Sequence, residues 1–100
     1  MTSFSPPKHL TLEARRFWRR VNAEYVLTPD GALILQVAAE NWDRAQMARE
    51  QVTREGLTLE GRRHPACDVE KVAYGLFLRA MRQLALDVVP PGKVGRPGGS

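Results

Sequence analysis

The chain has little of the chemistry on which most enzymes and metal proteins depend. Its 100 residues include one cysteine and two histidines. A single cysteine excludes an intramolecular disulfide framework, which makes a reducing, cytoplasmic setting the default. No apolar run approaches the length needed to span a bilayer, and the N-terminus lacks the apolar core of a signal peptide. With 43% hydrophobic and 26% charged residues, the composition is typical of an ordinary soluble domain.

Motifs of the common catalytic classes are also missing. The sequence contains no Walker-type phosphate loop, no G-x-S-x-G and no H-E-x-x-H. The glycine-rich stretch "GKVGRPGG" at 92–99 follows no expected strand and precedes no expected helix, so it does not fit a nucleotide-binding loop. We therefore expect neither enzyme activity nor a cofactor.

The stretch "RRHPACD", Arg62 to Asp68, gathers residue types that bind metals or act in catalysis. It holds His64, Cys67 and Asp68, whereas the second histidine lies far away in the sequence. Zinc needs three or four ligands, and a nucleophilic thiol needs a base held beside it. The same residues also suit a helix start, with Pro65 at the first helical position and Asp68 facing the positive end of the helix dipole. We interpret the segment as a helix start and expect no metal.

Capping residues mark the expected helices. Thr11 is a plausible N-cap for a first helix that begins at Leu12. The sequence "TPD" from Thr28 combines a capping hydroxyl, proline at the first helical position and an acid near the positive end of the dipole. This second helix runs unbroken to Glu55, where Gly56 is expected to supply a left-handed stop.

The remainder of the chain completes an all-α prediction. Apolar and polar residues alternate weakly over 57–63 around a glycine, which predicts a small β-hairpin or an irregular loop. Pro65 opens a third helix that continues to about Asp87. We expect a helical domain over 1–89, in which an amphipathic first helix packs on a long helical hairpin. Residues 90–100 are rich in proline and glycine and predict a flexible, disordered tail.

The first two expected helices each present one apolar stripe at helical spacing. The stripe of the first helix comprises Ala14, Phe17, Trp18, Val21 and Tyr25. The stripe of the second comprises Ile34, Val37, Ala38, Asn41, Trp42, Ala45, Ala48 and Val52.

The third helix is different because it has two apolar stripes. The first comprises Val69, Val72, Ala73, Leu76, Phe77, Ala80 and Leu84. The second comprises Tyr74, Leu78, Met81 and Ala85. Either the first helix lies across the second stripe or another subunit covers it, since exposed apolar patches mark interfaces.

Positive charge is concentrated at the two ends of the chain. The net charge is +3 over 1–27, −2 over 28–56, +1 over 57–89 and +2 over 90–100. Such a distribution would suit a polyanion that contacts the ends. The candidate phosphate contacts are the four arginines of the first helix and the two cations of the tail: Arg15, Arg16, Arg19, Arg20, Lys93 and Arg96.

Several short motifs, taken in order, resemble the small subunit of tailed-bacteriophage terminases. The likeness extends from about Pro6 to Leu86. Its elements are Pro7-Lys8-His9-Leu10, an "FW" pair in the first helix, Leu27-Thr28-Pro29, "ENWDRA" around Trp42, Glu55-Gly56-Leu57 and His64-Pro65.

This resemblance implies a non-catalytic role in viral genome packaging. Small terminase subunits are mostly helical, assemble into homo-oligomeric rings and recognise double-stranded viral DNA. They also regulate a large subunit that carries the ATPase and the nuclease. The resemblance thus implies action in the cytoplasm of the infected bacterial host, with no membrane partner. The candidate oligomer interface is then Tyr74, Leu78, Met81 and Ala85 of the second stripe, and Trp42 belongs to the core or the ring interface. The resemblance does not specify which residues contact DNA, so the choice of the arginines depends only on where positive charge lies.

Two other classes remain open. One is a small helix-turn-helix transcriptional regulator, because the turn over 26–29 between the first two helices is short enough for that motif. A second helix that is net acidic and about twenty-five residues long is, however, poorly suited to act as a recognition helix in the DNA major groove. The other class is a helical scaffold or adaptor that binds no nucleic acid.

Overall fold

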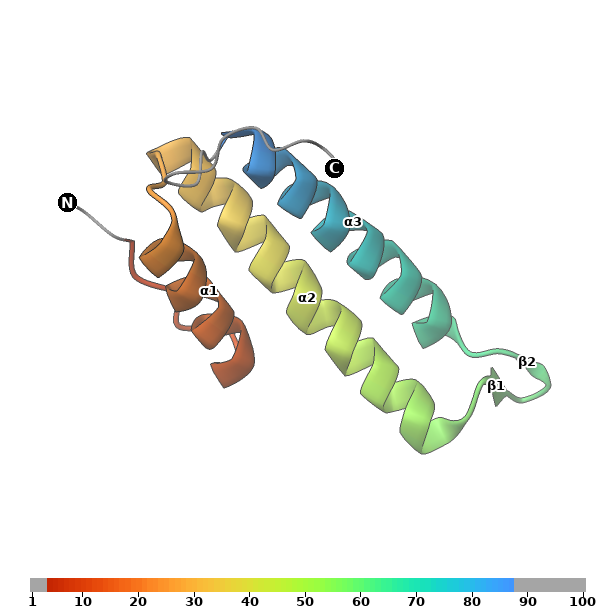
Figure 1. Cartoon of the computed structure of the whole chain (residues 1–100). Helices are drawn as coiled ribbons and strands as arrows, with labels where there is room; N and C mark the ends of the chain where they lie inside the picture. Colours follow the sequence, from red (N-terminus) through yellow and green to blue (C-terminus); the bar gives the residue numbers. More distant parts are fainter. Residues whose placement is uncertain (1–3, 88–100) are drawn as a thin grey trace, which may run out of the picture.

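The computed structural model describes residues 4–87, with the side chains of 85–87 excepted. It contains three helices, α1 (Leu12–Glu24), α2 (Pro29–Glu55) and α3 (Pro65–Asp87). The helices α2 and α3 pack side by side along their length as a hairpin, and α1 lies along the half of α2 that follows Pro29 (Figure 1). The all-α prediction is confirmed for this part of the chain, whereas the expected tail at 90–100 lies outside the described residues.

The predicted helix starts are confirmed. The Oγ1 atom of Thr11 accepts a hydrogen bond of 3.2 Å from the Ala14 N–H, and Thr28 accepts one of 3.0 Å from the Gly31 N–H. The predicted left-handed stop at Gly56 is wrong in its detail. Its φ of +92° is positive, but its ψ of 164° is extended. The chain continues directly from α2 into a strand, so Gly56 does not fold back over the helix end.

The segment between α2 and α3 forms a small hairpin rather than an irregular loop. Strands β1 (Thr58–Leu59) and β2 (Arg62–Arg63) pair antiparallel, with Thr58 opposite Arg63 and Leu59 opposite Arg62. The two turn residues, Glu60 and Gly61, have φ of +53° and +78°. Positive φ at both positions is what a two-residue type I′ turn requires, and it matches the twist of the flanking strands.

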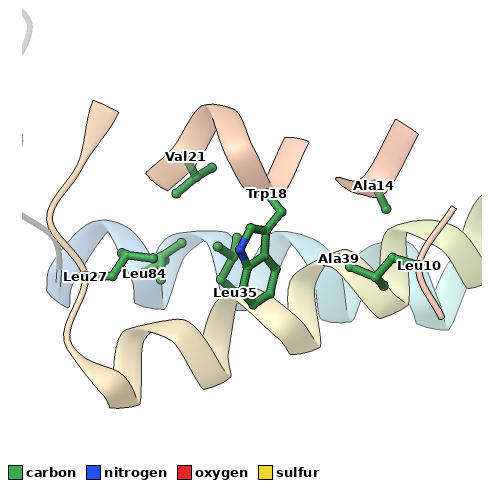
Figure 2. Packing of buried hydrophobic residues seen from close by; sticks show 8 residues of the cluster. All are labelled: Leu10, Ala14, Trp18, Val21, Leu27, Leu35, Ala39 and Leu84. Carbon is green, nitrogen blue, oxygen red and sulfur yellow. The ribbon is translucent and has the colours of Figure 1, made fainter. Parts of the chain in front are cut away.

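The main core lies where α1 packs on the α2–α3 hairpin. Leu35 of α2 is completely buried, and Trp18 of α1 projects toward it (Figure 2). The indole N–H of Trp18 donates a 2.7 Å hydrogen bond to the carbonyl of Phe4, which satisfies the polar end of this buried ring. The cluster of buried residues contains Leu10, Ala14, Trp18, Val21, Leu27, Leu35, Ala39 and Leu84.

The predicted apolar stripes are correct for α1 and only partly correct for α2. In α1, Ala14, Trp18 and Val21 are buried as predicted. In α2, Val37 is 47% exposed, while Leu35 and Ala39, which the predicted stripe omits, are both 0% exposed. Because α1 packs on α2 as well as α3, the buried arc of α2 is wider than a single stripe and includes Leu35 and Ala39, whereas Val37 lies outside it.

The first predicted stripe of α3 is buried only in part. Ala73, Ala80 and Leu84 are buried, but Val69 and Val72 are exposed. Both valines lie in the N-terminal half of α3, which α1 does not reach (Figure 1). The apolar surface of this half therefore remains open to solvent.

Candidate nucleic-acid interface

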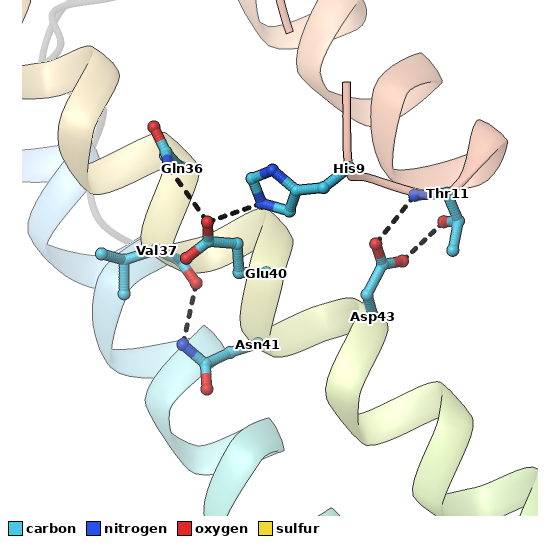
Figure 3. A network of polar contacts seen from close by, with 7 residues as sticks. All are labelled: His9, Thr11, Gln36, Val37, Glu40, Asn41 and Asp43. Atoms are coloured by element: carbon cyan, nitrogen blue, oxygen red, sulfur yellow. Dashed lines mark hydrogen bonds and ion pairs between the residues drawn. The ribbon is translucent and has the colours of Figure 1, made fainter. Parts of the chain in front are cut away.

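The N-terminus of the arginine-bearing helix α1 is fixed to α2 by a buried carboxylate. Asp43 accepts a 2.9 Å hydrogen bond from the Thr11 N–H and a 2.5 Å hydrogen bond from the Thr11 hydroxyl (Figure 3). Thr11 is the N-cap of α1, so the negative charge of Asp43 also lies at the positive end of the helix dipole. Asp43 thus holds the N-terminus of α1 in place on α2.

A second contact joins the residues before α1 to the same face of α2. His9 Nε2 lies 2.7 Å from Glu40 Oε2, and the Gln36 amide donates to that same oxygen at 3.0 Å (Figure 3). The hydrogen bond from Gln36, together with the contact to His9, holds the pKa of Glu40 below its ordinary value. The carboxylate is therefore ionised near neutral pH and available to both partners.

The role of this polar face of α2 was not predicted from the sequence. Gln36, Glu40 and Asp43 follow one another at i, i+4 and i+7, which is the spacing of a helical stripe. A polar stripe of this kind normally indicates a solvated face. Here Asp43 is buried, because the N-terminus of α1 supplies its hydrogen-bond donors.

The four predicted DNA contacts of α1 form what we call the arginine face: Arg15, Arg16, Arg19 and Arg20. Arg16, Arg19 and Arg20 are exposed, and Arg15 is half-buried. No ion pair within the described residues involves any of the four. Their charge is therefore not neutralised locally and is available to an anionic partner.

The structure divides the arginine face into two pairs. At 100° per residue, Arg16 and Arg20 lie roughly 100° around α1 from Arg15 and Arg19. Arg16 and Arg20 line a cleft between the three helices, and the Arg20 guanidinium lies 6.0 Å from the centre of the Phe17 ring. We call this the aromatic cleft, and its lining residues are Glu13, Arg16, Phe17, Arg20, Trp42, Phe77 and Met81.

The second predicted stripe of α3 borders this cleft. Met81 lines it and packs against the main core, so α1 covers this end of the stripe. Tyr74 and Leu78 remain 45% and 43% exposed. The side chain of Ala85 is not among those described, and Lys93 and Arg96 lie outside the described residues. The structure thus brings Arg16 and Arg20 together with Met81, a grouping that the sequence did not predict.

His64 has a structural role at the start of α3, which agrees with the interpretation of residues 62–68 as a helix start. Its Nδ1 accepts a 3.0 Å hydrogen bond from the Ala66 N–H, so its Nε2 carries the proton and donates to Glu55 Oε1 at 2.6 Å. The His64 carbonyl accepts a further hydrogen bond from the Cys67 N–H. Both ring nitrogens are therefore occupied. Within the described residues, no group of three or more histidine, cysteine, aspartate or glutamate side chains is arranged to hold a metal ion.

The comparisons with known proteins add no identification. No protein-family model, no curated protein and no solved structure matches the chain. Across the described part of the chain, no helix has the length and apolar character needed to cross a membrane.

Proposed function

We propose that the protein is a non-catalytic DNA-packaging subunit similar to the small subunits of phage terminases. On this proposal it binds double-stranded viral DNA as an oligomeric ring and regulates a large subunit. The observation that carries the proposal is the arginine face of α1. It combines three exposed arginines and one half-buried arginine without an ion pair among the described residues.

The position of α1 favours contact with a phosphate backbone. Asp43 fixes the N-terminus of α1 on the α2–α3 hairpin, so the backbone that carries the arginines is already ordered before binding. Each neutralised phosphate releases counterions, which makes such binding strongly dependent on salt. In a ring, every subunit repeats the face, and weak contacts add through multivalency.

The helix-turn-helix alternative has less support. A recognition helix must present one side to the major groove. The second helix here is packed by both α1 and α3, and its exposed side mixes Leu33, Val37 and Met47 with charged residues. That apolar surface is unsuited to reading base edges.

The DNA proposal is tested by fluorescence anisotropy with labelled duplex DNA at increasing salt. We expect Arg16→Glu with Arg20→Glu to weaken binding by at least about tenfold and to flatten its salt dependence. The matched control is Arg62→Glu with Arg63→Glu, which makes the same charge change on the exposed strand β2. If the control variant loses DNA binding and the α1 variant keeps it, DNA contacts the β1–β2 hairpin instead of α1. If wild type shows no salt-dependent binding, the protein fits a scaffold without nucleic acid.

The oligomeric part of the proposal is tested by light scattering of the full chain. A closed ring predicts a single large mass, whereas a regulator predicts a dimer. Leu78 is already partly exposed in the subunit, so Leu78→Glu disturbs little of its core. We expect this substitution to lower the mass while far-UV circular dichroism is unchanged, because a charge buried at a dry interface is costly. An unchanged mass would place the interface elsewhere.

A further inference from the structure

The floor of the aromatic cleft is a preformed apolar surface. Phe17 and Phe77 pack against each other in a tilted arrangement, with ring centres 6.0 Å apart and planes inclined by 59°. Trp42 and Met81 complete the floor, and all four side chains are only partly buried. The cleft has a volume of about 540 Å³, which lies in the range of pockets that accept ligands. The contact between Phe17 and Phe77 joins the α1 side of this floor to its α3 side.

The apolar surface continues beyond the cleft along α3. The Tyr74 ring stacks on Phe77 with centres 5.9 Å apart, and Leu78 lies one helical turn after Tyr74 on the same side of α3. Both Tyr74 and Leu78 are more than 40% exposed. A small ligand would fill the cleft and leave this extension uncovered. A polypeptide segment can cover both.

The rim of the cleft is positively charged. Arg16 and Arg20 stand one turn apart on α1, and Glu13 is the single carboxylate among the lining residues. The rim therefore carries a net charge of +1. No described residue forms an ion pair with either arginine. Charge complementarity then favours a partner that bears carboxylates beside its apolar group.

We propose that the aromatic cleft binds an acidic segment of a second protein. An aromatic or large aliphatic side chain of this segment inserts against Phe17, Trp42 and Phe77, and its carboxylates pair with Arg16 and Arg20. Duplex DNA would satisfy the arginines but would leave the apolar floor unused, because its bases are stacked inside the double helix. The proposal does not depend on DNA binding, since it rests on the floor as much as on the charge.

The probe for this proposal is a fluorescein-labelled amphipathic peptide that carries phenylalanine and leucine on one face and glutamates beside them. Anisotropy is measured with the full-length wild-type chain in the absence of DNA. We expect saturable binding and a blue shift of tryptophan emission, because Trp42 is partly exposed while Trp18 is already buried. The shift should disappear in Trp42→Phe.

Two double variants of equal charge separate the cleft from general electrostatic attraction. Arg16→Glu with Arg20→Glu should weaken peptide binding by about tenfold or more. Arg15→Glu with Arg19→Glu alters the other side of α1 and should weaken it much less. A peptide with serine in place of its apolar residues should not bind, and this control leaves the protein unaltered.

The proposal is overturned by any of four results. The first is that the peptide does not saturate the wild-type chain, and the second is that both double variants lose binding equally. The third is that the serine peptide binds as tightly as the apolar one. The fourth is that duplex DNA quenches or shifts Trp42 emission in the same way, which would make DNA the occupant of the cleft. If the wild-type chain binds the peptide but does not bind duplex DNA, the proposed function is contradicted and the cleft proposal stands.

Discussion

The two halves of the α2–α3 hairpin are held together by different interactions. The half that lies against α1, called the proximal half, buries large side chains such as Leu35 and Leu84. The half that ends in β1 and β2, called the distal half, buries mainly alanines: Ala45, Ala48, Ala66 and Ala73. Its larger apolar residues, among them Met47, Val69 and Val72, remain exposed.

This difference follows from the reach of α1. Where a third helix is present, apolar area can be removed from water on two sides of α2. Where it is absent, two helices alone bury little, and alanine permits their close approach. The distal half instead depends on local devices, namely the His64 cap and the two-residue turn. Its stability is therefore expected to respond to polar substitutions more than to truncation of its apolar side chains.

The largest expected effect is the loss of a proximal core side chain. Leu35→Ala should lower the free energy of unfolding by about 3 kcal/mol, because Leu35 is completely buried and its removal leaves a cavity. The matched distal substitution, Met47→Ala, should change it by less than about 1 kcal/mol, since Met47 is 58% exposed. Urea unfolding followed by circular dichroism measures both. Equal losses would abolish the distinction between the halves.

The second prediction concerns the attachment of α1. Asp43→Asn retains the shape of the side chain but replaces one carboxylate oxygen by a donor, so it cannot accept both hydrogen bonds from Thr11. We expect a loss of about 2 kcal/mol, the usual contribution of hydrogen bonds to a charged group. Amide hydrogen exchange of the variant should be faster than in wild type, and this increase should be larger in α1 than in the distal half of the α2–α3 hairpin. Thr11→Ser keeps the hydroxyl and should stay close to wild type.

The third prediction tests the capping of the distal half. His64→Ala removes the acceptor for the Ala66 N–H and the donor to Glu55, and it should cost about 1–2 kcal/mol. His64→Asn can still cap the helix, so it should recover part of this loss. If both variants unfold at the wild-type urea concentration, the distal half does not depend on its cap.

The sequence predicted the elements better than their packing. Helix ends are set by nearby residues, as at Thr11 and Thr28, so all three helix starts and the end of α2 could be read from the sequence. The side of α2 that faces α1 depends on contacts between residues distant in the sequence. Val37 was therefore predicted to be buried, and the role of Asp43 was missed. Both errors arise from one unknown, the place where α1 docks.

The candidate site shows the same division. The arginines of α1 and the second stripe of α3 were each evident as patterns along one helix. The sequence did not show that the two patterns lie together in the aromatic cleft, because this requires α1 and α3 to approach each other across α2. Phe17 and Phe77 are sixty residues apart in the chain, and no local spacing relates them.

The fourth prediction compares a carboxylate from each half during acid titration. The hydrogen bond from His64 holds the pKa of Glu55 below its ordinary value of 4.5. The hydrogen bond from the Gln36 amide is the main cause that lowers the pKa of Glu40 in the same way. A lowered pKa means that the folded state binds fewer protons than the unfolded state. The resulting stability is present above about pH 4.5 and is lost as the pH falls through the folded pKa.

Thermal melting between pH 6 and pH 3 tests this comparison. Glu55→Gln should lower the melting temperature at pH 6 and reduce its dependence on pH below 4.5. Glu40→Gln, which lies in the proximal half, should likewise lower the melting temperature at pH 6 and reduce its dependence on pH below 4.5. A wild-type slope in both variants would mean that other carboxylates cause the acid sensitivity.

The smallest expected effect belongs to the exposed ion pair that bridges the two helices in the distal half. Arg49 Nε donates to Glu70 Oε2 at 2.9 Å, but the Arg49 side chain is 63% exposed. Water and salt weaken such a pair, and holding two long side chains costs conformational entropy. A double-mutant cycle with Arg49→Ala and Glu70→Ala should therefore give a coupling below about 0.5 kcal/mol that declines with added salt. A coupling as large as the effect of the His64 cap would make charge, rather than capping, the main support of the distal half.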